Sequence, residues 1–314
     1  MEIFSRFNHI ILTWSWLVFT FLLNGLMGAQ TQEEKPVHQL SVHHDNDFPL
    51  GIDQYYTAGS FIGYSKALSN NFIFNNTADA SLQLDVFVGQ LIHTPKDLLS
   101  TNLDDFERPY AGYLYTSAAV SQAKRSHMWI VSGEFGFAGP LSLAGSIQVE
   151  FHKLINRPIP TWVGEIENSI HVNTYGNYVK SFQKKANFFV DLHSRTAFGT
   201  RQIFVEQQAT LFFGNRSAIN KSSFYDKIDS VPELYGYGSV YYRSVGLNAL
   251  IQGHPWGDNS PFTLRIENQI VGARLGAVLR RRSNTFQLEY VIQTNETMRE
   301  ERIQYVSAVF KRVF

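Results

Sequence analysis

The sequence predicts an all-β fold, an antiparallel transmembrane β-barrel. Segments of about ten residues alternate between apolar and polar side chains, aromatic residues collect near the ends of these segments, and the chain closes on one of them at Phe314. A tilted strand that crosses a bilayer needs about 9–11 residues, and membrane barrels carry aromatic girdles at both interfaces. A soluble sandwich or barrel is the alternative, because periodicity alone does not show whether the apolar face points inward or to lipid.

The N-terminal residues, ahead of any strand, predict a secretory signal peptide. Arg6 precedes an apolar stretch at about residues 10–27, and the small residues Gly28 and Ala29 follow it. A basic residue, an apolar core and small residues in this order are typical of a cleaved leader. We expect a signal peptide over residues 1–29 and the barrel over residues 30–314, with a retained single-span anchor as the alternative.

Residues 81–90 show the strand pattern. Leu84, Val86 and Val88 lie on one face of the segment, while Gln83 and Asp85 lie on the other. The chain length at roughly 20–25 residues per strand and loop predicts about 10–14 strands, and bacterial barrels favour even numbers. Similar segments occur at residues 60–64, 128–137, 186–193, 202–213, 239–251, 262–271, 273–279, 285–292 and 303–314.

Residues 151–170 interrupt the alternation. Phe151 and Leu154 have helical spacing, and Pro158 and Pro160 follow them. We therefore expect a short loop helix near residues 150–157, outside the barrel wall. Loops with structure of their own often carry function.

Composition and missing motifs exclude several functional classes. The chain has no cysteine, which excludes disulfides, a thiolate nucleophile and cysteine-ligated zinc. Its 27 Lys and Arg balance its 27 Asp and Glu, which does not suit a nucleic-acid partner. The motifs HExxH of zinc peptidases and GxSxG of serine hydrolases are absent. The basic run at residues 280–282 predicts a solvated hairpin turn, with contact to lipid phosphates as the alternative.

Three polar clusters could carry chemistry. The first contains Asn46, Asp47 and Asp53, whose oxygens suit a hard cation such as calcium, although an Asx turn between two strands is the alternative. The second covers residues 108–115, where a polar turn with interfacial tyrosines is the alternative. The third contains His152 near acidic residues; a histidine can be a general base because its pKa lies near neutrality, and a surface histidine is the alternative.

Together, the order and spacing of these residues resemble the lipid A 3'-O-deacylase family over about residues 40–170. Beyond about Asn168 only the barrel pattern is recognised. The resemblance implies a twelve-stranded barrel in the bacterial outer membrane, with its active site between the wall and a loop helix near the outer leaflet. The matching positions are Asn46-Asp47, Tyr56-Thr57-Ala58-Gly59, Gly63-Tyr64-Ser65, Gly139-Pro140, His152, Pro160, Trp162 and Glu165-Ile166-Glu167-Asn168.

The same resemblance implies a reaction and roles for residues. The reaction is calcium-dependent hydrolysis of the ester that carries the 3'-acyloxyacyl group of lipid A. His152 is the expected general base, Asp47 and Asn46 are the expected metal ligands, and Asn46 and Thr57 are expected to orient substrate or metal. The expected partners are lipid A or lipopolysaccharide and the lipids of the outer membrane, and we expect a monomer.

The sequence departs from the family at two places. The family has an acidic residue about six positions after its histidine, where Arg157 and Pro158 stand here, and Glu165 or Glu167 are the available substitutes. Lys96 is the candidate for a basic residue that the family has before the second cluster. Two alternatives therefore stay open: a lipid hydrolase of another specificity, and a catalytically altered, non-enzymatic barrel of the same fold.

Overall fold

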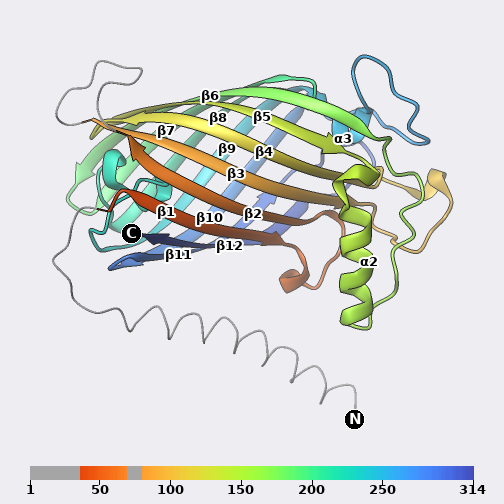
Figure 1. Cartoon of the computed structure of the whole chain (residues 1–314), viewed down its shortest axis with the longest axis horizontal. Coiled ribbons are helices and arrows are strands. Elements are labelled where there is room, and N and C mark those ends of the chain that lie inside the picture. The colour runs from red at the N-terminus through yellow and green to blue at the C-terminus, as the bar shows by residue number, and fades with distance from the viewer. Residues whose placement is uncertain (1–35, 69–79) are drawn as a thin grey trace, which may run out of the picture. The chain divides into compact units, whose positions relative to one another are not determined.

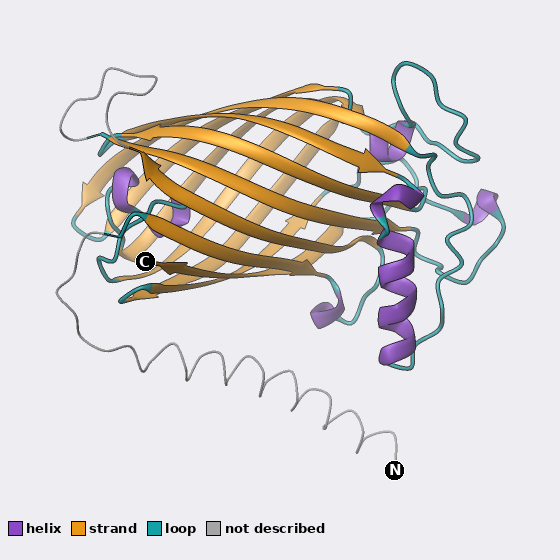
Figure 2. Ribbon diagram, viewed as in Figure 1, coloured by secondary structure: helices purple, strands orange, loops and turns teal. Residues whose placement is uncertain are grey.

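The computed structural model describes residues 36–68 and 80–314, which form a closed barrel of twelve antiparallel strands (Figures 1 and 2). Each strand pairs with its neighbours in sequence, and β1 pairs with β12 to close the ring. This confirms the predicted all-β barrel and its twelve strands. The strands are β1 (His38–Asn46), β2 (Tyr55–Leu68), β3 (Ser81–Thr94), β4 (Ala111–Ala123), β5 (His127–Ala138), β6 (Ser169–Lys185), β7 (Phe188–Gly199), β8 (Gln202–Asn215), β9 (Glu233–Asn248), β10 (Gln269–Arg281), β11 (Asn284–Gln293) and β12 (Ile303–Val313).

Helical segments occur only in the connections between these strands of the described chain. They are η1 (Phe48–Leu50), η2 (Leu103–Asp105), η3 (Pro140–Ser142), α2 (Ala144–Leu154), η4 (Ile219–Lys221), η5 (Ser223–Tyr225) and α3 (Ala249–Gln252). Within residues 36–68 and 80–314, no helix is long and apolar enough to cross a membrane. The predicted signal peptide lies outside the described residues and stays a prediction.

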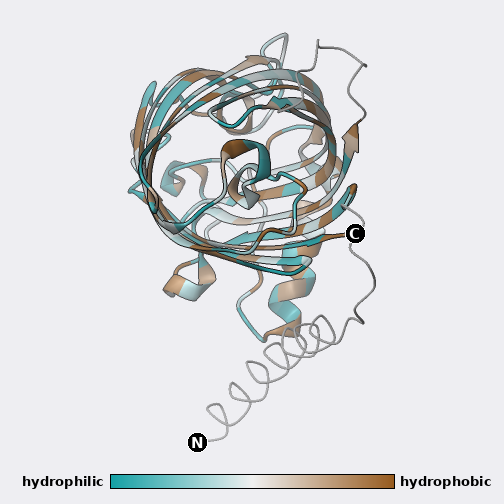
Figure 3. Ribbon diagram, turned by 90° about the vertical axis from the view of Figure 1, so that its left-hand side faces the viewer, coloured by the Kyte–Doolittle hydropathy of each residue, from teal (hydrophilic) through white to brown (hydrophobic). Residues whose placement is uncertain are grey.

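The barrel wall is apolar outside and polar inside. In β3, Val86 and Val88 are exposed, whereas Gln83 and Asp85 are buried and hydrogen-bonded to each other. Figure 3, which looks along the barrel, shows polar and apolar residues alternating around the ring. A soluble barrel has the opposite arrangement, so the apolar outer surface is that of a barrel surrounded by lipid.

The connection between β8 and β9, residues 216–232, folds into one end of the barrel, and we call it the plug. Lys227 of the plug donates to Ser121 of β4, and Gln83 of β3 donates to the carbonyl of Asp226 (2.7 Å). These bonds reach strands far from β8 and β9 around the ring. The plug therefore fills the lumen at the end where both described termini lie (Figures 1 and 3).

The basic run beside the plug differs from its prediction. Arg281 and Arg282 are exposed, as a solvated hairpin turn requires. The prediction is wrong for Arg280, which is buried and donates to the carbonyl of Val231 (2.6 Å) and pairs with Glu233 (3.2 Å). An inward position on β10 directs this arginine into the plug.

Near the C-terminus, the predicted strand 273–279 lies within β10, whereas the predicted strand 262–271 is wrong except for residues 269–271. Residues 262–271 and 273–279 do not form two strands, since β10 runs unbroken through Gly272 and residues 262–268 belong to the connection before it. A Cβ at Gly272 would collide with the ring of Tyr241, so this glycine makes room inside the barrel. The predicted segment 239–251 also ends early, at Asn248, whose side chain caps α3.

The loop helix was predicted in the right connection but too late in the chain. It begins at Ala144 and ends at Leu154, whereas the prediction placed it near residues 150–157. Its start is set by Leu143, which has a left-handed backbone conformation (φ 60°), and Asn156 (φ 55°) follows its end. The following strand β6 was not predicted at all, because Gly176 and polar neighbours interrupt its alternation.

Candidate active site

Helix α2 lies outside the ring of strands, against the outer surface of the barrel (Figures 1 and 3). It is near the end opposite the plug, which we call the loop end. Gln90 of β3 donates from Nε2 to the carbonyl of Ser142 (2.7 Å), which ties the start of the helix to the wall. A Cβ at Gly112 of β4 would collide with Ser142 and Ala144. The glycine of the 108–115 cluster therefore permits the close approach of α2 to the barrel.

The two faces of α2 have different surroundings. Ala144, Gln148 and His152, each four residues apart, are buried. Ile147 and Phe151 on another face are exposed, although they are apolar. A helix of this kind lies at a membrane surface with its apolar face in lipid, so the buried stripe faces the wall at the lipid boundary.

One hydrogen bond and one close carboxylate fix the imidazole of His152, which is 4 % exposed. Its Nδ1 lies 2.7 Å from the carbonyl oxygen of Pro158, and its Nε2 lies 3.3 Å from Oδ2 of Asp53. A carbonyl can only accept, so Nδ1 carries the hydrogen and donates it. In the neutral imidazole, Nε2 then carries the lone pair that a general base needs, and a proton between Nε2 and Asp53 makes their contact attractive.

The partner of Nδ1 explains one departure from the family. Pro158 stands six residues after His152, where the family has an acid, and its main-chain carbonyl accepts the bond. Within residues 36–68 and 80–314, neither Glu165 nor Glu167 forms a hydrogen bond or ion pair with His152. Glu167 instead accepts from the N–H of Asn259 (3.0 Å). Burial raises the pKa of Glu165 to about 7.

Asp47, which is fully buried, and Asp53, which is partly buried, are neighbouring carboxylates in the connection between β1 and β2. Oδ2 of Asp47 accepts from the N–H of Gln54 (2.7 Å), while its Oδ1 and Oδ1 of Asp53 have no hydrogen-bond partner. Burial raises the pKa of Asp47 to about 8, and the charge of Asp53 adds to this effect. Burial also raises the pKa of Asp53, against the attraction of His152 and Arg157.

The pair fits an oxygen-liganded cation. Each carboxylate has a buried oxygen without a partner, and hard cations such as calcium take carboxylate and carbonyl oxygens. No group of three or more His, Asp or Glu side chains with metal-site geometry occurs in the described part of the chain. A cation here would complete its shell with main-chain, water or substrate oxygens.

Asn46 and Thr57 lie beside this pair. Oδ1 of Asn46 accepts from the N–H of Phe48 (2.7 Å). This bond forms the Asx turn that the sequence predicts as the alternative to a metal site. Thr57 is the extra residue of a bulge in β2, its hydroxyl is 2.7 Å from that of Thr94, and its carbonyl accepts from the N–H of Asp47 (3.3 Å). The structure thus brings His152, Asp53 and Asp47 together, with Asn46 and Thr57 adjoining through the main chain.

Sequence reasoning missed one buried polar residue beside His152, Gln148. Its Oε1 accepts from Nε1 of Trp162 (2.9 Å), and its Nε2 is buried without a hydrogen-bond partner. The spacing of four residues from His152 places it one turn away on the same helix face, which is the signal that could have found it. The candidate Lys96, in contrast, is exposed and pairs with Glu301 (2.7 Å).

Comparison with known proteins identifies relatives of this arrangement. A family model described as "Outer membrane protein LpxR" matches residues 15–313. LpxR from Salmonella typhimurium superposes with a TM-score of 0.72 at 19 % identity, covering 88 % of this chain and 100 % of that one. The β domain of the Bordetella autotransporter Brka has a TM-score of 0.50 at 7 % identity, covering 90 % and 100 %. At these identities, both likenesses show the fold alone. None of the curated proteins matches the sequence.

Proposed function

This chain belongs to the LpxR family of outer-membrane lipid A deacylases, and from that premise we propose that His152 is the general base that hydrolyses the 3'-acyloxyacyl ester of lipid A. The protein is thus an ester hydrolase in an outer-membrane β-barrel. One observation supports the role of His152 most. His152 lies on an amphipathic helix whose other face is apolar and exposed, and its Nε2 is 3.3 Å from Asp53, so the proposed base lies where a lipid ester would arrive.

The imidazole moves the protons of the reaction. Nε2 of His152 takes a proton from a water molecule, and the water oxygen forms a bond to the ester carbonyl carbon. Asp53, 3.3 Å from Nε2, stabilises the imidazolium that results, and the bond from Nδ1 to Pro158 keeps the ring in place. The ester C–O bond then breaks, and His152 returns the proton to the leaving alkoxide, which yields a free fatty acid and a lipid alcohol.

The negative charge of the tetrahedral intermediate needs stabilisation. The buried Nε2 of Gln148 is a free donor on the same helix face as His152, and we assign it to this oxyanion. A calcium ion held by Asp47, with Asp53 and Asn46 beside it, would polarise the ester carbonyl. Thr57, through its bond to Thr94, would support the loop that carries Asp47.

The proposal is tested in isolated outer membranes, by measuring the mass of lipid A after incubation with calcium or with chelator. With calcium, the wild-type chain is expected to remove one acyloxyacyl group. His152→Gln should slow this release by roughly 100-fold to 10,000-fold, which is the contribution of a general base. Lys153→Gln is the matched control, because Lys153 is the next residue, is exposed and pairs only with Glu150 in the described chain.

Each outcome separates the candidate functions. If His152→Gln retains the wild-type rate, His152 is not the base. If the wild-type chain leaves lipid A intact but releases fatty acid from phospholipid, it is a lipid hydrolase of another specificity. If neither lipid changes and the barrel is folded, as judged by heat-modifiable migration on a gel, the chain is a non-enzymatic member of the fold.

A further inference from the structure

The barrel interior contains a cavity of about 330 Å³. Inward-facing side chains line it, and the connections before β10 and before β12 contribute residues at the loop end, so it lies on the opposite side of the lumen from the plug. Tyr56 and His93 face it from β2 and β3. Helix α2, which carries His152, lies outside the ring of strands, so the barrel wall separates this cavity from His152 (Figure 3).

Three arginines of the lining surround a single buried carboxylate. Glu206 is fully buried and accepts from Arg195 (3.0 Å) and from Arg243 (2.6 Å). Arg274 adds its positive charge, so that Arg195 is repelled by both Arg243 and Arg274. The carboxylate lies behind the guanidinium groups, and the positive groups form the surface of the cavity.

The remaining ion pairs of the lining are loose. Arg201 is 3.6 Å from Glu134, and Arg274 is 3.9 Å from Glu289, both beyond hydrogen-bond distance. Nε of each arginine is buried without a hydrogen-bond partner. A guanidinium has five N–H donors, so both side chains keep unused donors beside the cavity.

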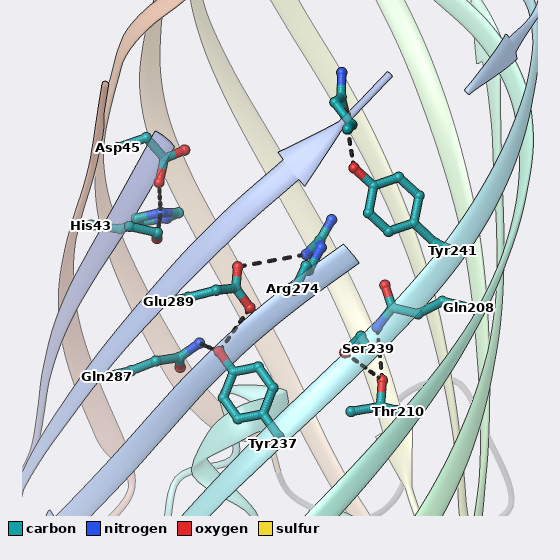
Figure 4. Close-up of polar contacts among 12 residues, drawn as sticks. His43, Asp45, Gln208, Thr210, Tyr237, Ser239, Tyr241, Arg274, Gln287 and Glu289 are labelled. Carbon is teal, nitrogen blue, oxygen red and sulfur yellow. Dashed lines mark hydrogen bonds and ion pairs between the residues drawn. The ribbon is translucent and has the colours of Figure 1, made fainter. Parts of the chain in front are cut away.

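Aromatic rings hold these side chains in position. The guanidinium carbons of Arg274 and Arg243 lie 5.1 and 5.7 Å from the ring centroid of Tyr241. Figure 4 shows Arg274 projecting into the lumen between Glu289 and Tyr241. Stacking on a ring leaves the donor edge of a guanidinium free and limits its motion, which favours bidentate recognition of an oxyanion.

The lining of the cavity itself contains fewer acidic residues than arginines. Glu296 lies 3.5 Å from the buried Arg108, which it shares with Glu300 (3.1 Å). Glu267 is the other carboxylate at the surface of the cavity, in the connection before β10. Four arginines and two carboxylates therefore reach the surface of the cavity, whereas the partners of the arginines, Glu134, Glu206 and Glu289, do not belong to its lining.

We propose that this cavity binds a small oxyanion, a phosphate or carboxylate group, through Arg195, Arg243 and Arg274. Such a group would relieve the repulsion among the three arginines and accept from the donor of Arg274 that has no partner in the described chain. The ligand enters either as a free ion or as an anionic group carried by a glycolipid at the loop end. This site is independent of the hydrolytic site on the outer surface.

The test is calorimetric titration of inorganic phosphate into the full chain, purified and folded in detergent. Saturable binding with one phosphate per chain is expected. Arg274→Gln should weaken it roughly tenfold or more, because hydrogen bonds to charged groups contribute about 1.5–3 kcal/mol. Arg281→Gln is the matched control, since this arginine is exposed at the other end of β10 and should leave binding unchanged. His152→Gln should also bind normally.

Two further measurements close the alternatives. Arg274→Lys keeps the positive charge but loses the two parallel N–H donors of the guanidinium. Its affinity for phosphate should lie between those of the wild type and Arg274→Gln, and this graded result would show that the loss in Arg274→Gln is not caused by misfolding. To find the source of the anion, binding of the protein to micelles of lipid A is compared with binding to micelles of dephosphorylated lipid A. If the wild type prefers lipid A and Arg274→Gln does not, the ligand is the lipid headgroup. If the wild type binds both equally, the ligand is the free ion. The proposal is overturned if phosphate binding does not saturate, or if Arg281→Gln weakens it as much as Arg274→Gln.

Discussion

Two aspartates at opposite ends of the barrel are both fully buried, and their surroundings are opposite. Asp191, next to the plug, accepts hydrogen bonds from Arg216, Ser181 and Tyr225. Asp47, at the loop end, accepts one bond from a main-chain N–H, and its other oxygen has no partner. The protein neutralises the first carboxylate itself and leaves an oxygen of the second without a partner, which is the difference expected between a structural acid and the metal ligand that we propose.

Replacing Asp191 should have the largest effect of the changes considered. Asp191→Ala leaves Arg216 buried without its carboxylate, which we expect to lower the free energy of unfolding by about 3–5 kcal/mol. Denaturant unfolding of the detergent-solubilised protein measures the change. Ser194→Ala, on the same strand and partly exposed, is the control. A stability equal to the wild type would mean that the network beside the plug does not hold the fold.

Replacing Asp47 should lower the activity and leave the fold intact. Asp47→Asn removes the ligand charge, and we expect deacylation to fall at least about 100-fold, since a metal contributes several kcal/mol of charge stabilisation. Without calcium the variant should be at least as stable as the wild type, because it removes a buried carboxylate that has no counter-ion. Lipid A mass and thermal unfolding are measured together. Equal loss of stability in Asp47→Asn and Asp191→Ala would contradict the comparison.

The pH dependence of calcium binding tests the role of Asp47 further. Without a cation, the pKa of Asp47 is raised to about 8, whereas in the unfolded chain it is about 4. The proton stays on the folded form, so the calcium-free protein should lose stability as pH rises from about 4 to 8. Calcium needs the ionised carboxylate, and its stabilisation should therefore grow between pH 6 and pH 9, reaching about 2.7 kcal/mol at a hundred times Kd.

Thermal unfolding with and without calcium measures both trends, and Asp47→Asn should flatten them. A calcium effect that is the same at pH 6 and pH 9 would remove Asp47 from the metal site.

The smallest effect is expected at Lys96. Its pair with Glu301 is exposed, and exposed pairs contribute little to stability. Lys96→Ala should leave thermal unfolding unchanged and lipid A deacylation within twofold of the wild type. A large drop in activity alone would show that this lysine reaches the substrate and stands for the basic residue of the family.

Much of the fold followed from local patterns in the sequence. The alternation in segments such as 81–90 was sufficient because each strand has one face in lipid and one in the lumen. It failed where an inward position needs a small residue, as at Gly272, or where a polar strand crosses the wall, as β6 does. The burial of Arg280 was not predictable, since it depends on a plug about 50 residues earlier in the chain.

The site was predictable only in part. The histidine and the Asn46-Asp47 pair came from the resemblance, and the contact of His152 with Asp53 needed the packing of α2 across β3 and β4. The proposed role of Gln148 depends on which face of α2 is buried, and this is set by the same packing. Such long-range contacts are absent from any window of the sequence.

The bond from His152 to Pro158 has a consequence for how this enzyme can be altered. Its acceptor is a main-chain atom, so replacing the side chain at position 158 does not delete it. An alanine scan would therefore miss one of the groups that orient the proposed base. Only a change in the course of the chain after α2, such as an inserted or deleted residue between the two positions, removes the acceptor. Loss of the family's acid is therefore compatible with an oriented histidine, and the tolerance of this chain to substitution should exceed its tolerance to a change in loop length.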